Sequence, residues 1–337
     1  MKILPWHHGE FDRLLAEKAR LPHALLIQGP HGIGKAAFAQ TLAQALLCES
    51  PEPSGAACGR CAACHWLEAG THPDYRQIEP ESLTEADAEE QGSDKKKASL
   101  QITIEQIRAL PEFIGISSHR GGPKVVLIHP AEALNINAAN ALLKSLEEPP
   151  AHTYFFLVSH RPHSLLPTIK SRCRQLTLQG PAQEAATAWL KSQGMANPEL
   201  SLAQAGNSPL TALQFDNDEY WRLRNAFLGG IAAARFDPLA LAEQVRDYPI
   251  PQVVSWLQKW SYDLVSQKFV GTIRYNPDHK TALAAAASRV DALSALRFHR
   301  EMVRLQRIVN HPLNPRLLIE QLLISYAGLL QPQRSAA

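Results

Sequence analysis

The sequence lacks the features that mark membrane proteins, secreted proteins and strongly charged proteins. No apolar run approaches the roughly 18–20 residues that a membrane helix needs. The segment Met1 to His8 lacks the longer apolar core of a secretory signal, so we expect a cytoplasmic protein. The formal net charge is only +2, which does not by itself indicate a nucleic-acid binder. The net charge does not exclude a local basic patch. No internal repeat is evident.

Short apolar runs and helical patterns alternate in the first half of the 337-residue chain. The apolar runs predict buried parallel strands at residues 24–27, 124–128 and 154–158. Apolar residues at helical spacing predict helices at 35–47 and 134–146, and a further helix that follows residues 102–104 and runs through Ile107 and Leu110. This alternation is typical of an α/β domain with a parallel sheet.

Helical patterns alone fill the rest of the chain. A sequence of this length has room for two or three domains. We predict an α/β domain over residues 1–180, a small helical lid domain over 181–213 and an all-α domain over 214–337. Trp221, Trp256 and Trp260 are expected to pack in the all-α core rather than to bind a cofactor.

One glycine-rich turn falls between a predicted strand and a predicted helix. It reads Gly29-Pro30-His31-Gly32-Ile33-Gly34-Lys35-Ala36, which matches a phosphate-binding P-loop except at its last residue. The loop retains the parts that hold phosphate, which are Gly29, Gly32, Gly34 and Lys35. Weak nucleotide binding is therefore compatible with the sequence. An accidental glycine-rich turn is the alternative, but a chance match would rarely fall between a strand and a helix.

The P-loop lacks the groups that would hold magnesium and activate water. Ala36 has no hydroxyl to ligate Mg²⁺. The apolar run at 124–128 leads into His129 and Pro130 instead of acidic residues, and Glu132 is expected to lie too far along to replace them. Phosphoryl transfer needs metal, positioned water and charge stabilisation together. We therefore predict no ATP hydrolysis, doubtful ATP binding and no Mg²⁺, with a divergent working ATPase as the alternative.

Four of the five cysteines fall within seventeen residues, which in a cytoplasmic chain indicates a metal site rather than disulfides. Cys48, Cys58, Cys61 and Cys64 can supply four thiolates to one structural Zn²⁺ within a module over residues 48–64. His65 is a possible substitute ligand, and free buried thiols are the alternative. Cys173 lies far away in the sequence and is expected to pack near the end of a strand.

One segment follows neither the strand nor the helix pattern. Residues 81–99 hold an acidic block followed by three lysines, and such a segment buries too little apolar surface to order itself. We predict a solvated loop rather than a functional basic patch, because the acidic block neutralises the lysines.

Three further segments accompany the P-loop in a specific order. One runs from Leu134 to Pro150 and contains Asn140-Ala141-Leu142-Leu143-Lys144 and Glu147-Glu148-Pro149-Pro150. The others are Leu165 to Cys173, which ends in Ser171-Arg172-Cys173, and Asn314-Pro315-Arg316-Leu317-Leu318. Together with the P-loop they resemble the clamp-loader subunits of the AAA+ class, and the match covers essentially the whole chain.

This resemblance implies membership of a ring-like hetero-pentamer in a bacterial DNA polymerase holoenzyme. Such a complex uses ATP to open a sliding clamp and close it on primer-template DNA. The implied partners are ATP-hydrolysing motor subunits and a clamp-opening subunit, and the all-α domain would form the oligomeric collar. The defects at Ala36, His129 and Pro130 favour a stationary, non-hydrolysing subunit over an active motor subunit.

The resemblance also implies roles for two arginines. Arg172 matches the arginine finger that enters the ATP site of the adjacent subunit, the alternative being a structural arginine paired within its own fold. Arg316 resembles the second-sensor arginine of this class, but beside a degenerate site a structural role is equally expected.

A third hypothesis is a free-standing zinc protein that binds nucleic acid. It requires a basic, aromatic-rich module around the cysteines. Only Arg60, His65 and Trp66 lie there, which is thin support.

Overall fold

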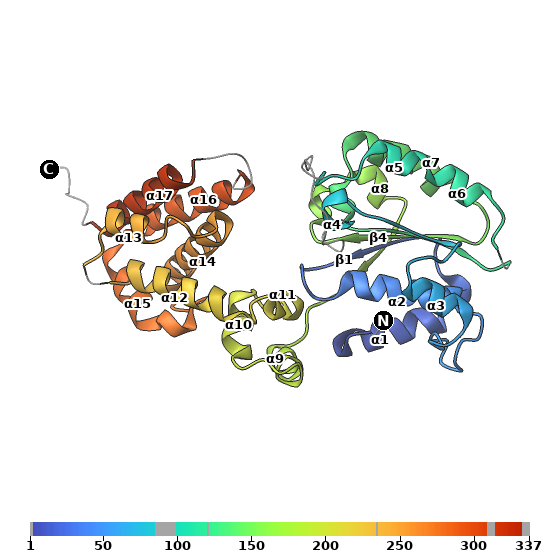
Figure 1. Ribbon diagram of the computed structural model, residues 1–337, viewed down its shortest axis with the longest axis horizontal. Helices are drawn as coiled ribbons and strands as arrows, with labels where there is room; N and C mark the ends of the chain where they lie inside the picture. The colour runs from blue at the N-terminus through green and yellow to red at the C-terminus, as the bar shows by residue number, and fades with distance from the viewer. Residues whose placement is uncertain (1–2, 85–98, 120, 234, 309–313, 332–337) are drawn as a thin grey trace. The chain divides into compact units, whose positions relative to one another are not determined.

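The computed structural model describes residues 3–84, 99–119, 121–233, 235–308 and 314–331 (Figure 1). Its contacts divide the chain into two compact units, Met1–Pro181 and Ala182–Ala337. The further division of the second part into lid and collar domains stays a prediction. Within the described residues, no helix combines the length and the apolar character that crossing a membrane requires.

A parallel sheet forms the centre of the first unit. Among the described residues it has five strands in the order β2-β3-β4-β1-β5. The strands are β1 (Ala24–Gln28), β2 (Tyr75–Ile78), β3 (Lys124–Ile128), β4 (Thr153–Ser159) and β5 (Arg174–Thr177). The central strands β1, β3 and β4 confirm the three predicted apolar runs. The edge strands β2 and β5 have one buried residue each, Ile78 and Leu176, so no apolar run marked them in the sequence.

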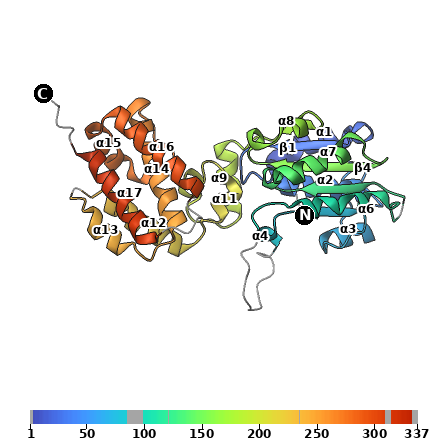
Figure 2. The same ribbon diagram turned by 90° about the horizontal axis from the view of Figure 1, so that it is seen from above.

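Helices cover both faces of this sheet (Figures 1 and 2). One face packs on α1 (His8–Ala16), α2 (Lys35–Leu47) and α3 (Ala62–Glu68), and the other on α5 (Ile104–Arg108), α6 (Leu110–Gly115), α7 (Ile136–Glu147) and α8 (Pro167–Lys170). Strand alternation separates the two cores, because Leu25 and Ile27 face the first and Leu26 faces the second. The predicted α/β domain with a parallel sheet is confirmed.

Local capping sets some helix boundaries away from those predicted. Helix α7 begins at Ile136 because the Asn135 side chain accepts a hydrogen bond from the Ala138 N–H at 2.8 Å. In the predicted loop at 81–99, residues Glu81–Thr84 form the short helix α4, and 85–98 lie outside the described residues. Short 3₁₀ turns are η1 (Pro5–His7), η2 (Lys18–Arg20), η3 (Ala131–Ala133), η4 (Pro162–Ser164) and η5 (Pro277–His279).

The described part of the second unit is helical. Its first helices, α9 (Gln183–Ser192), α10 (Pro198–Gln204) and α11 (Pro209–Leu213), share a small core. A larger core joins α12 (Asp218–Ile231), α13 (Pro238–Gln244), α14 (Ile250–Phe269), α15 (Lys280–Arg289), α16 (Ala292–Ile308) and α17 (Pro315–Leu330).

Helix α14 carries two buried tryptophans into the larger core. Trp256 donates its indole N–H to the Tyr220 hydroxyl at 3.0 Å, and Trp260 donates to the Tyr326 hydroxyl at 2.9 Å. Both are packing residues, as predicted, whereas Trp221 is only half-buried at the edge of this core.

Buried polar bonds tie α10 to the larger helical core. Arg224 is fully buried and donates to Asp278 at 2.7 Å and to the Asn276 side-chain oxygen at 2.9 Å. The Gln204 amide donates to the same Asn276 oxygen at 2.9 Å. A cut near residue 213 would therefore leave buried polar groups unpaired, whereas a cut after Pro181 follows the boundary between the compact units.

Candidate functional site

The glycine-rich turn has the local geometry that a P-loop requires. It connects the end of β1 to the first residue of α2, so the predicted strand–turn–helix context is confirmed. At Gly29 a Cβ atom would lie 2.2 Å from the Leu178 carbonyl oxygen, which excludes any side chain there. Gly34 has a φ of 94° at the helix start, a conformation that favours glycine.

Lys35 is turned into its own loop. Its side chain is 2% exposed, and its ammonium donates to the Pro30 carbonyl oxygen. Burial lowers the pKa of Lys35 to about 8, and the charge of Glu132 acts in the opposite direction. The ammonium that would contact phosphate in a working P-loop is thus bound by backbone of the same loop.

The N-terminal segment lies against the P-loop. Trp6 donates its indole N–H to the Ile33 carbonyl oxygen at 2.9 Å, and His7 Nε2 donates to the same oxygen at 2.8 Å. Sequence patterns did not reveal these contacts, because both residues lie more than twenty positions before Ile33. They stabilise the loop in its present shape.

Three histidine rings gather beside the loop. The ring centroids of His31 and His160 are 4.6 Å apart, and those of His129 and His160 are 5.3 Å apart. Burial, helped by the charge of Lys35, lowers the pKa of His160 to about 3, and burial also lowers the pKa of His31. Both rings are therefore neutral at pH 7, and neutral imidazole is a poor ligand for Mg²⁺.

The two nearby carboxylates are engaged with these histidines. His129 Nδ1 donates to Glu79 Oε1 at 3.2 Å, and the Gln77 amide donates to the same oxygen at 2.8 Å. Both Glu132 oxygens accept the His160 backbone N–H, at 3.0 and 3.2 Å. Glu132 comes closer to the loop than its sequence position suggested, since its charge raises the pKa of Lys35, but its oxygens hold the neighbouring backbone.

The cysteine cluster converges as predicted. Cys48 follows the end of α2, Cys61 caps the start of α3, and Cys64 lies in the first turn of α3. The Cys48 sulfur is 3.6 Å from the Cys58 sulfur and 3.9 Å from the Cys61 sulfur, and all four sulfurs lie within 4.8 Å of one another. Tetrahedral zinc with Zn–S bonds of about 2.3 Å places sulfurs roughly 3.8 Å apart, so the four residues fit this metal.

Within the described residues, this is the one cluster of three or more potential ligands that converges on a metal position. It excludes His65, which is exposed and contributes no ligand. It also excludes Cys173, which packs in the sheet core, where burial raises the pKa of its thiol to about 11. The module over 48–64 contains one arginine, no lysine and two glutamates, which is unfavourable for binding nucleic acid.

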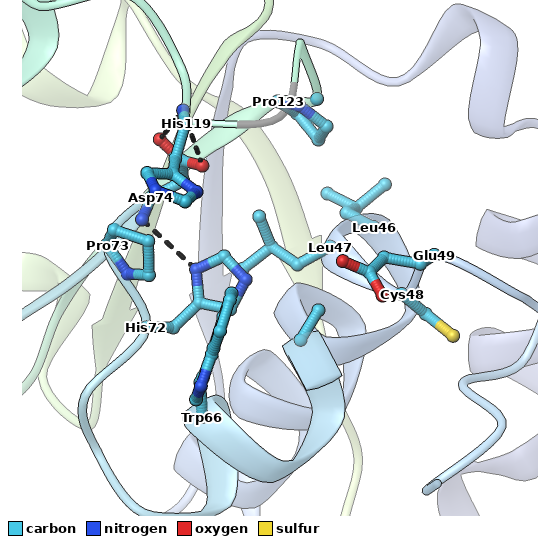
Figure 3. A pocket seen from close by; sticks show the side chains of 12 residues that line it. Leu46, Leu47, Cys48, Glu49, Trp66, His72, Pro73, Asp74, His119 and Pro123 are labelled. Atoms are coloured by element: carbon cyan, nitrogen blue, oxygen red, sulfur yellow. Dashed lines mark hydrogen bonds between the residues drawn. The ribbon is translucent and has the colours of Figure 1, made fainter. Parts of the chain in front are cut away.

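A cavity of about 150 Å³ lies beside the cysteine module (Figure 3). Asp74 sits at its wall, with its carboxylate accepting the His119 N–H at 3.2 and 3.1 Å and pairing with the buried Lys124 ammonium at 3.0 Å. The Trp66 ring meets the rings of His72 and His119 edge to face. A cavity of this volume holds a group the size of one benzene ring, which is far smaller than a nucleotide.

Arg172 brings two of the sequence motifs together. Its guanidinium pairs with Glu147 at the end of α7 and donates to the Thr168 carbonyl oxygen at 2.9 Å. The two charged side chains remain 31% and 49% exposed. Arg172 therefore has a partner within its own fold, but one that solvent, and hence another molecule, can reach.

The partners of Arg316 are two glutamates of the helical unit. It lies in the first turn of α17, where it donates to Glu320 at 2.9 Å and lies 3.6 Å from a Glu243 oxygen. Its side chain is 68% exposed. These pairs suit a structural role within the helical unit.

Comparisons with known proteins agree along the chain. A family model described as DNA polymerase III, delta subunit, matches residues 10–182, and one described as its C-terminal part matches 218–327. The DNA polymerase III subunit delta' of Pseudomonas aeruginosa is 36% identical over 349 residues, covering 98% of this chain and 99% of that protein. The Escherichia coli subunit delta' is 31% identical over 344 residues, covering 98% and 97%. A crystal structure of a DNA polymerase III gamma subunit-related protein from Thermotoga maritima aligns with a TM-score of 0.48 and 17% identity, covering 96% and 99%.

Proposed function

Because this chain belongs to the delta' family of DNA polymerase III clamp-loader subunits, we propose that it is the stationary, non-hydrolysing member of its complex. The observation that carries this proposal is the composition of its P-loop site. Ala36 offers no hydroxyl, His129 and Pro130 replace the acidic residues, and the Lys35 ammonium is bound within its own loop. A site of this kind has neither the metal ligands nor the base that phosphoryl transfer requires.

The partners of the proposed complex follow from this role. The chain would join motor subunits and a clamp-opening subunit in a cytoplasmic hetero-pentamer that loads a sliding clamp onto primer-template DNA. Cys48, Cys58, Cys61 and Cys64 would hold a structural Zn²⁺ that ties the end of α2 to α3. Four thiolates leave no open position for water, so this metal would have no catalytic step.

Arg172 would act on a neighbouring subunit. Its pair with Glu147 is partly exposed, and exposed pairs contribute only about 0–1 kcal/mol. A γ-phosphate carries more negative charge than a carboxylate and offers several oxygens to the guanidinium, so it can replace Glu147 at little cost. We therefore place Arg172 as the finger that stabilises charge in the ATP site of the adjacent motor subunit.

The isolated chain should not hydrolyse ATP above background. The reason is that Ala36, His129 and Pro130 remove metal and base functions together. The measurement is phosphate release with Lys35→Ala as the control. Turnover that Lys35→Ala abolishes would contradict the stationary role and favour the alternative, an active motor subunit.

The second compact unit should carry the main assembly contacts. A chain that ends at Pro181 should keep its α/β fold, because the cut follows the unit boundary, yet fail to join the complex. Circular dichroism and metal content test the fold, and size-exclusion chromatography with the other subunits tests assembly. Assembly of the shortened chain with undiminished affinity would show that the collar assignment is wrong.

A further inference from the structure

Two adjoining cavities lie in the helical unit, on the surface between α12 and α14. One, of about 390 Å³, is formed by the segment before α12 together with residues of α12, α14 and α16. The other, of about 400 Å³, continues from it, because Asn217, Tyr220 and Gln252 line both. Each reaches the size of an ordinary ligand pocket, and together they form one groove.

Lys259 lies in the first cavity without a counter-charge. No Asp or Glu lines this cavity, and within the described residues the ammonium has neither an ion pair nor a hydrogen bond. Nζ lies over the Phe215 ring, at 5.2 Å from the ring centroid. Burial and the nearby charge of Arg224 lower the pKa of Lys259 to about 8. An enclosed cation of this kind is stabilised by an anionic partner.

Gln252 lines both cavities and has a side-chain oxygen that lacks a hydrogen-bond donor among the residues that the structure describes. Its side-chain oxygen is buried and accepts no hydrogen bond from the described residues. A buried acceptor without a donor destabilises the free chain, so a ligand that supplies an N–H group to this oxygen binds more tightly. A backbone amide of an extended peptide is such a donor.

We propose that this groove binds an extended peptide segment of a partner protein. An Asp or Glu side chain of the peptide pairs with the Lys259 ammonium, and a peptide N–H donates to the Gln252 oxygen. The second cavity has a net negative lining, because Asp247 lines it together with Glu219 and Arg222, which lie 3.7 Å apart and offset each other. The groove therefore matches a peptide in which a positively charged residue follows the acidic one.

The same features are unfavourable for a nucleic-acid strand. The net negative charge that Asp247 gives the second cavity would repel the phosphates that follow the first one. In the first cavity, Tyr220 stacks on Phe215 with ring centroids 4.5 Å apart and Trp256 is only 1% exposed, so neither Tyr220 nor Trp256 offers a free face on which a base could stack.

The test uses the full chain and a phage-displayed library of random short peptides. Peptides recovered on the wild-type chain are synthesised, and their affinities are measured for Lys259→Met, which keeps the apolar stem against Phe215. Lys280→Met removes an exposed lysine charge outside the groove and serves as the matched control. We expect the recovered peptides to contain Asp or Glu. Lys259→Met should lower their binding affinity about tenfold or more, because it removes a charge-assisted hydrogen bond.

The acidic residue of the peptide is then changed to its amide to complete a double-mutant cycle. If the two groups pair, the combined changes weaken binding no more than either change alone. Gln252→Leu should also weaken binding while raising the thermal stability of the free chain, because it removes the buried orphan oxygen.

Several results would overturn the proposal. They are failure to recover any peptide, recovery of peptides without acidic residues, and equal affinity for Lys259→Met and the wild type. Displacement of the peptides by single-stranded oligothymidylate, with that displacement lost in Lys259→Met, would assign the groove to nucleic acid instead.

Discussion

Arg172→Ala should silence one motor site of the reconstituted clamp loader although the altered chain hydrolyses nothing itself. A guanidinium supplied in trans accelerates phosphoryl transfer by about 10³–10⁵ in GTPases, so the site that it serves should fall to near background. The DNA-stimulated ATPase and the clamp-loading rate of the whole complex should drop accordingly. Lysine should not restore them, because it lacks the planar fork that matches phosphate oxygens.

The intramolecular pair of Arg172 provides the controls for this experiment. Glu147→Gln frees the guanidinium from its partner, so a finger would keep its activity in that variant. A structural arginine would instead give the same loss in Glu147→Gln as in Arg172→Ala. Arg174→Ala is the matched control, because Arg174 lies two residues away, 3.6 Å from a Glu17 oxygen. An unchanged ATPase in Arg172→Ala, with assembly confirmed, would show that Arg172 is structural.

Cys61→Ser should lower the zinc content from one ion per chain to a small fraction of that. The binding free energy of structural zinc is also folding free energy, with apparent values of about 10–16 kcal/mol in zinc-finger peptides. Loss of the ion should therefore unfold residues 48–64 locally and lower the midpoint of thermal unfolding. Metal analysis of freshly purified protein and limited proteolysis within this module measure the two effects.

The remaining cysteine provides the control for the zinc experiment. Cys173 is buried in the sheet core and lies outside the cluster, so Cys173→Ser should keep its zinc even if it loses some stability. Wild-type protein that contains no stoichiometric zinc would reject the metal assignment.

The local parts of the site were predictable because their residues are close in the sequence. The P-loop needs one strand end, one glycine turn and one helix start, and all three lie within residues 24–47. Three of the cysteines are only three residues apart, and the fourth follows the helix just before them. Short-range spacing of this kind constrains geometry whatever the rest of the chain does.

Other parts were not predictable, because they join residues that only the folded sheet brings together. The edge strands β2 and β5 bury only one residue each, so no apolar run identified them. The Glu79–His129 pair joins β2 to the end of β3 across fifty residues. Because β2 was not predicted from the sequence, nothing in the sequence placed the Glu79 carboxylate beside His129.

The sequence by itself determined the fold class, the cysteine cluster and the loss of the magnesium and base groups, because residue identity decides which atoms are present. Tertiary structure decided how the remaining groups are used. It turned Lys35 onto the Pro30 carbonyl, set Glu132 on the His160 backbone and paired Arg172 with Glu147. Each of these contacts depends on the directions of side chains from separate elements, which burial and hydrogen bonding fix only when the sheet and its helices have packed.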